Sequence, residues 1–256
     1  MRQGYEERPS RFDGAVVWTW TPSARPARPA RTVLPDGCMD LIWTGGRIVV
    51  AGPDTRAFRV APSDRGPSAA IRFAPGTAPA LLGVPAHELR DDRVELAALW
   101  PGGLVRRLTE RIDRAADPAA ALERLALDRA AETAPPDPLT TAVADGLRRG
   151  RTVGQTAAQV GLGPRQLHRR SLAAFGYGPK TLARVLRLQR ALALVRSGLP
   201  YAEAAAVAGC ADQAHLAREM RDLAGTTLGA YFAPGEDAAA GANSDTPQPS
   251  GSRTTA

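Results

Sequence analysis

Short runs of apolar residues, rich in β-branched and aromatic side chains, fill the first hundred residues of the chain. Glycine, proline and aspartate separate the runs at close spacing, which is the pattern of strands in an all-β sandwich or barrel. We therefore predict a β-rich, sandwich-like or barrel-like domain over residues 1–100. The predicted strands are AVVWTWT (15–21), RTVL (31–34), MDLIWTG (39–45), RIVVAG (47–52), AFRVAP (57–62) and SAAIRFAPG (68–76).

The spacing of apolar residues becomes helical in the middle of the chain. Helical patterns over 102–115 and 118–131 form a connector, which we place at residues 101–138 and which ends in a proline-rich linker, AETAPPDP. Residues 139–232 have helical patterns throughout, whereas residues 233–256 contain too few apolar residues to form a core and are predicted to be disordered. The expected fold class is α+β, with a β-rich domain followed by an all-α domain.

Two segments of the helical half repeat the same pattern. They are AAQVGLGPRQLHRRSLAAFG (157–176) and AAVAGCADQAHLAREMRDLAG (205–225). In each, a glycine follows an alanine by four residues, and a Leu-x-Arg triplet and a closing glycine come after the turn. An alanine lets two helices cross closely, and a glycine accepts the left-handed backbone of a tight turn. The repeat predicts two helix-turn-helix units, at residues 152–176 and 200–225.

A single helix is predicted between the two units, over residues 178–197. A helix of this length spans about 30 Å, and successive major grooves on one side of B-DNA lie about 34 Å apart. The joining helix could therefore hold the second helices of the two units one turn of DNA apart. Its apolar residues form one stripe at helical spacing: Leu182, Val185, Leu188, Leu192 and Val195.

The second helix of each unit has an apolar inner face and a polar outer face. The inner faces carry Leu167, Ser171 and Ala174 in the first unit, and Leu216, Met220 and Leu223 in the second. Arginine can donate two hydrogen bonds to guanine and glutamine suits adenine, so the outer faces are the predicted DNA-contacting surfaces. The predicted DNA-binding residues are Arg165, Gln166, Arg169, Arg170, Gln213, Ala214, Ala217, Arg218 and Arg221.

The distribution of charge supports this prediction. The net charge is +7, and residues 139–232 carry 13 basic and 5 acidic side chains, against 19 and 18 in residues 1–138. Lys180 is the single lysine, which indicates a coding bias toward arginine, so the shortage of acidic residues is the informative feature. A basic excess in one segment is typical of a domain that binds a polyanion, and we expect double-stranded DNA as the partner.

The repeat and its joining helix are similar to a known family. Residues 139–232 resemble the DNA-binding domain of the AraC/XylS family of bacterial transcription regulators. The resemblance implies a sequence-specific, one-component regulator that places two recognition helices in adjacent major grooves. It is carried by Ala157, Gly161, Leu167, Arg169, Gly176, Gly178, Pro179, Arg190, Ala191, Ala205, Gly209, Asp212, Leu216, Arg218 and Gly225.

The chain departs from the pattern of that family at four positions. Ser171 stands where the family has a large apolar residue, and Cys210 stands in place of an aromatic residue. Near the end, Leu228 replaces a proline and Phe232 replaces an arginine. We therefore expect looser packing in the first unit.

The first hundred residues resemble an uncharacterised N-terminal domain of actinobacterial members of the family, through LPDGCMDLIW, VAGP and RFAPGTAPALLGVPAHEL. The resemblance and the domain layout imply effector sensing or dimerisation. We predict an effector pocket or a dimer surface near Trp18, Trp20, Trp43 and Arg72, because aromatic walls and an arginine suit a small carboxylate. Packing of the tryptophans in the strand core is the alternative. The further candidate partners are a small-molecule effector, RNA polymerase and a second copy of the chain.

Catalysis is not indicated. No Ser-His-Asp order, phosphate loop or paired carboxylates are present, so no enzyme activity, cofactor or metal is expected. Cys38 and Cys210 cannot supply a disulfide framework or a four-ligand zinc site. We expect Cys210 in the core and Cys38 as a small buried or loop residue, with a reactive sensor thiol as the alternative.

Two other functions compete with the regulator. One is a DNA-binding module fused to an enzyme domain, such as a cysteine-dependent alkyl acceptor, and the other is a nucleoid-type protein without sequence preference. No signal-peptide pattern or membrane-length apolar run is visible, so a cytoplasmic location is expected.

Overall fold

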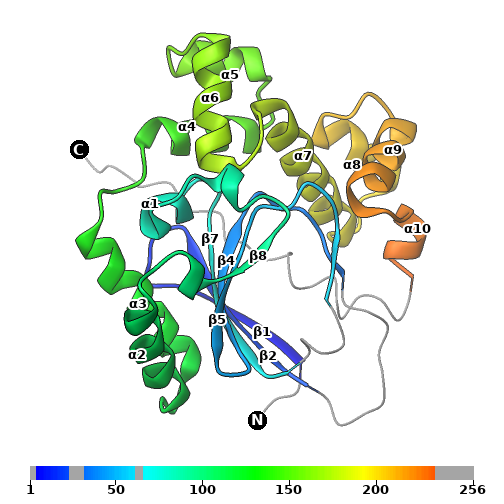
Figure 1. Ribbon diagram of the computed structural model, residues 1–256. Helices are drawn as coiled ribbons and strands as arrows, with labels where there is room; N and C mark the ends of the chain where they lie inside the picture. Colours follow the sequence, from blue (N-terminus) through cyan, green and yellow to red (C-terminus); the bar gives the residue numbers. More distant parts are fainter. Residues whose placement is uncertain (1–3, 23–31, 61–65, 234–256) are drawn as a thin grey trace, which may run out of the picture.

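The computed structural model describes residues 4–22, 32–60 and 66–233 (Figure 1). A β-rich N-terminal part is followed by a helical C-terminal part, which confirms the predicted α+β class. The segment predicted to be disordered lies outside the described residues, apart from Ala233.

Six strands form one antiparallel sheet in the N-terminal part, in the order β1-β2-β7-β4-β5-β8. A separate short ladder pairs β3 with β6. The strands are β1 (Gly4–Pro9), β2 (Ala15–Thr21), β3 (Thr32–Val33), β4 (Met39–Thr44), β5 (Arg47–Ala51), β6 (Phe58–Arg59), β7 (Ser68–Phe73) and β8 (Arg93–Glu95).

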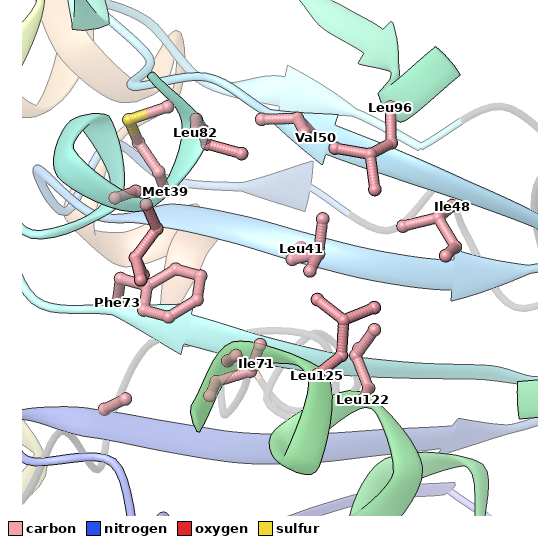
Figure 2. Close-up of a cluster of buried hydrophobic side chains, with 14 of the residues drawn as sticks. Met39, Leu41, Ile48, Val50, Ile71, Phe73, Leu82, Leu96, Leu122 and Leu125 are labelled. Atoms are coloured by element: carbon pink, nitrogen blue, oxygen red, sulfur yellow. The ribbon is translucent and has the colours of Figure 1, made fainter. Parts of the chain in front are cut away.

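One face of the six-stranded sheet is covered by two helices, α2 (Gly102–Asp113) and α3 (Pro118–Glu132) (Figure 1). Figure 2 shows Leu122 and Leu125 of α3 facing Leu41 and Ile71 of the sheet, and all four side chains are buried. Burial of the apolar stripe of each helix needs a partner surface. The sequence placed α2 and α3 in a connector between domains, whereas in the structure they form one hydrophobic core with the sheet.

The short helix α1 (Ala78–Leu82) is fixed through its carbonyl oxygens. Trp100 Nε1 donates to Leu82 O at 3.0 Å, and Arg129 Nε of α3 donates to Leu81 O at 3.1 Å. The last carbonyls of a helix have no partner within it, so these two donors stabilise the end of α1. Two 3₁₀ turns lie nearby, η2 (Ala86–Glu88) and η3 (Leu96–Ala98).

A buried carboxylate joins α3 to the β1–β2 hairpin. The side chain of Glu123 is 2% exposed and accepts hydrogen bonds from Arg8, from Ser10 Oγ and from the backbone and side chain of Arg11. Burial opposes ionisation of Glu123, but these donors outweigh it and lower the pKa of Glu123 from 4.5 to about 2. The hairpin is therefore held on α3 by an ionised side chain.

The helical part is arranged around α7, with one apolar cluster at each helix-turn-helix unit. Leu182 and Leu186 of α7 pack with the first unit, whereas Val185, Leu188 and Leu192 pack with the second. The predicted stripe is thus buried, although Val195 is only partly so. The helices are α4 (Pro138–Arg148), α5 (Val153–Gln159), α6 (Pro164–Phe175), α7 (Pro179–Arg196), α8 (Tyr201–Ala208), α9 (Gln213–Ala224) and α10 (Leu228–Tyr231).

The N-terminal part contacts the helical part directly. Leu34 is buried in the same apolar cluster as α7 and α9, and Gln189 Nε2 of α7 donates to Pro35 O at 2.6 Å. The described helices include none that is long and apolar enough to cross a membrane.

Replacing the buried carboxylate should lower stability in a pH-dependent way. Because the pKa of Glu123 is lower in the folded chain than in the unfolded one, the stabilisation is present above about pH 4.5 and is lost as the pH falls toward 2. We expect Glu123→Gln to reduce the free energy of unfolding by about 2–3 kcal/mol at pH 7, measured by urea denaturation. The gap to wild type should close as the pH falls from about 5 to 2.

Glu132→Gln on the same helix is the matched control. It removes an exposed ion pair with Arg129, with a nitrogen–oxygen distance of 3.4 Å, and should cost at most about 0.5 kcal/mol. A Glu123→Gln variant as stable as wild type at pH 7, or a gap that does not depend on pH, contradicts the assignment.

Candidate nucleic-acid interface

The first helix-turn-helix unit is formed by α5 and α6. Thr152 caps α5 by accepting a hydrogen bond from Gln155 N, and the Gln155 side chain accepts one from Thr152 N in return. Gly161 has a φ of +64° in the turn, and α6 begins at Pro164. The turn and the start of the recognition helix are therefore as the sequence predicts.

The two faces of α6 differ in exposure. Leu167, Ser171 and Phe175 are buried. Arg165, Gln166 and Arg169 are exposed. Within the described part of the chain, neither Arg165 nor Arg169 forms a side-chain hydrogen bond or ion pair, so both guanidinium groups are available to a ligand.

Two buried hydroxyl groups lie in the first unit. Ser171 Oγ of α6 and Thr156 Oγ1 of α5 have no hydrogen-bond partner among the described residues. A buried polar group without a partner typically costs about 1–3 kcal/mol. The two hydroxyl groups therefore lower the stability of the first unit, and the looser packing expected from Ser171 stays a prediction.

The second unit repeats the geometry of the first. Gly209 has a φ of +88° at the end of α8, and Asp212 caps α9 by accepting from His215 N at 2.6 Å. Leu216 and Met220 are fully buried on the inner face. The predicted outer residues Gln213, Ala214, Arg218 and Arg221 are exposed, and Ala217 is partly buried.

A buried carboxylate that the sequence prediction missed holds α9 on α7. Glu219 is 7% exposed and lies 2.9 Å from Arg184 Nε, 3.6 Å from Arg187 Nη2 and 3.4 Å from His215 Nε2. Its spacing of three residues from the buried Leu216 is the sequence signal that directs it inward. Glu219 thus positions the second recognition helix.

Arg190 of α7 joins α8 of the second unit to α4, the helix that precedes the first unit. Its Nη1 donates to Ala208 O at the end of α8, at 3.2 Å, and its Nη2 donates to Leu147 O at the end of α4, at 3.3 Å. Burial and the neighbouring Arg187 lower its pKa. This arginine, which carries part of the family resemblance, supports helix ends.

One of the predicted DNA-binding residues is engaged elsewhere. Arg170 forms an ion pair with Asp137, which also caps α4 by accepting from Leu139 N at 3.0 Å. Of the predicted DNA-binding arginines, Arg165 and Arg169 on α6 and Arg218 and Arg221 on α9 are exposed and have no such partner among the residues that the structure describes.

The residues of the predicted effector pocket do not share one face of the sheet. Trp18 and Trp20 of β2 lie on the face that also carries Arg72, opposite α2 and α3. Trp43 lies on the other face, packs against the core and donates from Nε1 to Asp113 of α2 at 2.7 Å. The grouping of Trp43 with the other three residues is therefore wrong, because side chains alternate between the faces of a strand.

Arg72 is already bound by two protein carboxylates. It is 3% exposed, and its Nε lies 3.1 Å from Asp40 Oδ1 and 3.6 Å from Asp36 Oδ2. Trp18 Nε1 also donates to Asp40, at 3.1 Å, and its ring lies 5.8 Å from that of Tyr5. The charge of Arg72 is therefore already opposed within the domain, and its role as the anchor of a carboxylate ligand stays a prediction.

The environment of Cys38 does not favour reactive thiol chemistry. Cys38 is buried, and burial and the neighbouring Asp36 raise the pKa of its thiol well above the ordinary value. Attack by a cysteine requires the thiolate, which this environment disfavours. Cys210 lies in the apolar cluster of the second unit, as predicted. No group of three or more metal-ligating side chains occurs within the described ranges.

Family models match both parts of the chain. Residues 156–233 match a family described as a helix-turn-helix domain, and residues 12–95 match a domain of unknown function (DUF6597). A search of the curated proteins finds no match.

Solved structures of ToxT from Vibrio cholerae are similar over most of the chain. One is 10% identical, covers 90% of this chain and 98% of that one, and has a TM-score of 0.45. Another, bound to (E)-4-(8-methylnaphthalen-1-yl)but-3-enoic acid, is 11% identical with the same coverage and TM-score. A ligand-free ToxT variant is 10% identical, covers 87% and 98% of the two chains, and has a TM-score of 0.44.

Loss of the Glu219 carboxylate should destabilise the second unit. We expect Glu219→Gln to lower the free energy of unfolding by about 1–3 kcal/mol, because the partly buried Arg184 and Arg187 lose a charged acceptor. Urea denaturation measures the change.

The matched control is Asp222→Asn on the same helix. Asp222 contacts the same Arg184 at 3.0 Å but its side chain is 66% exposed, so its loss should cost at most about 1 kcal/mol. Equal costs for the two variants would show that Glu219 does not hold α9.

Proposed function

We propose that the chain is an AraC-type, DNA-binding transcription regulator, and that α6 and α9 of its helix-turn-helix domain at residues 156–233 read adjacent major grooves of one operator. The observation that carries the proposal is the equivalent placement of exposed arginines on the two helices. Arg169 and Arg218 occupy the same position of the Leu-x-Arg triplet, and both point outward. The predicted contact residues Gln166, Gln213 and Arg221 lie on the same outer faces.

The spacing of the two helices supports this arrangement. The joining helix α7 has 18 residues and so spans about 27 Å. Both units bury side chains of α7, and Arg190 of α7 donates to the ends of α8 and of α4, which packs in the apolar cluster of the first unit. A pair of reading helices held by one rigid element suits two neighbouring grooves, whose separation is about 34 Å.

We propose that the N-terminal domain senses a small molecule or joins two copies of the chain, and that the regulator also contacts RNA polymerase. Residues 1–138 carry nearly equal numbers of basic and acidic side chains, which supports a role for the N-terminal domain other than attraction of DNA phosphates. Trp20 remains a candidate for such a surface, since it is only partly buried. Tryptophan fluorescence in a metabolite screen and analytical ultracentrifugation test the two forms of this proposal. A role on chromosomal DNA also implies a cytoplasmic location.

Truncation of the two equivalent arginines should weaken operator binding. We expect Arg169→Ala and Arg218→Ala each to cost about 1–3 kcal/mol if their guanidinium groups contact bases. The operator is obtained by selection from a random pool of duplexes, and affinity is measured by fluorescence anisotropy at several salt concentrations.

Arg106→Ala, which removes the same charge from the exposed surface of α2, is the control and should leave affinity within about twofold. Unchanged affinity of both test variants at moderate salt contradicts the two-helix proposal. A pool that yields no preferred sequence favours a nucleoid-type protein instead.

A further inference from the structure

Two segments of the N-terminal domain form one tightly bonded unit beyond the end of the β5–β8 pair. These segments, residues 52–58 and 86–93, are called the clamp. Asp91 N donates to Pro53 O at 3.1 Å, and the Asp91 carboxylate accepts from Thr55 N at 2.6 Å. Asp91 has a φ of +59°, a left-handed conformation that aspartate tolerates better than most residues. The two segments are therefore joined through backbone and side chain together.

A bidentate ion pair strengthens the clamp. The guanidinium of Arg93 binds both carboxylate oxygens of Asp54, at 2.7 Å and 2.9 Å, and lies 4.0 Å from the centre of the Phe58 ring. The Asp54 side chain is 10% exposed and that of Arg93 is 21% exposed, so the pair is largely shielded from water. Two parallel hydrogen bonds fix the orientation of both partners.

One side of the clamp contacts the C-terminal end of the first recognition helix. Arg90 Nη1 donates to the carbonyl oxygen of Gly176, the C-cap residue that follows α6, at 3.2 Å. Gly176 has a φ of +80°, and a β-carbon there would lie 2.6 Å from Pro53 Cγ and 3.2 Å from Ala86 O. The backbone at the end of α6 therefore packs directly against both segments of the clamp, with no room for a side chain at position 176.

The other side of the clamp contacts the C-terminal end of the second recognition helix. Ala57 N donates to Leu223 O of α9 at 2.7 Å. Ala57 also packs against the apolar cluster of the second unit. The final carbonyl oxygens of a helix lack partners within the helix, so this bond stabilises the end of α9 as Arg90 stabilises the end of α6.

On the basis of the two-groove function, we propose that the clamp is a positioning element: it holds the C-terminal ends of α6 and α9 at a fixed separation, so that the N-terminal domain determines the half-site spacing that the regulator prefers. The two contacts come from one bonded unit and reach both reading helices at the ends opposite their N-caps. A change at the end of the β5–β8 pair would therefore move one recognition helix relative to the other.

The test measures affinity as a function of half-site spacing. Fluorescence anisotropy is carried out with the full chain on the selected operator, on duplexes with one base pair inserted or deleted between the half-sites, and on a single half-site. One variant is Arg90→Met, which removes the hydrogen bond from the clamp to Gly176 at an exposed position. The other is Asp54→Asn/Arg93→Met, which opens the clamp and removes both charges together, so that neither stays buried alone.

Arg47→Met is the matched control, because it removes an exposed ion pair of the same β5–β8 pair, with Glu95 at 3.6 Å, away from both recognition helices. In wild type and in the control, one inserted base pair, which moves and rotates one half-site relative to the other, should reduce affinity by about tenfold. In both clamp variants the reduction should fall to about threefold or less, with half-site affinity within about twofold of wild type.

One contradicting result is that the clamp variants melt as wild type does and still lose about tenfold in affinity on the duplex with one inserted base pair. That result would overturn the proposed positioning role of the clamp and leave the two-groove function intact. Loss of half-site binding in the clamp variants would also overturn it, because the damage would then lie within a single unit. A wild-type protein with no spacing preference would instead overturn the two-groove function itself.

Discussion

The carbonyl oxygens at the C-terminal ends of short helices are the constraint around which this molecule is organised. Each helix leaves its last carbonyls without internal partners, and short helices have few other bonds to offset the loss. Arg190 donates to the ends of α4 and α8, and Arg90 and the backbone of Ala57 donate to the ends of α6 and α9. Each of these donors lies outside the helix whose carbonyl oxygen it bonds. The same hydrogen bonds therefore fix how the helices lie relative to the rest of the molecule.

This constraint explains how the domains cooperate. The two helix-turn-helix units have separate apolar clusters and could move about α7 if packing alone joined them. Arg190 and Glu219 remove part of that freedom from within the helical domain, and the clamp removes more of it from outside. The reading surfaces remain free of these contacts, with Arg165, Arg169, Arg218 and Arg221 exposed on the outer faces.

The repeated local pattern was the part of the structure that the sequence could predict. The glycines at 161 and 209, the start of α6 at Pro164 and the cap at Asp212 depend on backbone conformation within a few residues, so each leaves a direct signal. The stripe of α7 likewise follows from helical periodicity. The composition of the N-terminal strands indicated β structure for the same reason, since propensity and alternation are local properties.

The contacts between distant segments could not be predicted in this way. The sequence did not show that Asp36 and Asp40 lie beside Arg72. Trp43 was grouped with residues of the opposite face because the register between the strands was unknown. Arg170 was assigned to DNA although Asp137, 33 residues away in the chain, lies within reach of it. The arginine partners of Glu219 and the carbonyl partners of Arg190 lie on other helices, and nothing in the immediate sequence identifies them.

The central claim is that one chain reads two adjacent major grooves, and hydroxyl-radical footprinting of the full-length protein on its selected operator tests it most directly. The account predicts two protected patches on the same side of the duplex, with centres about 10–10.5 base pairs apart. A single protected patch at saturating protein, or two patches on opposite sides of the duplex, would contradict it.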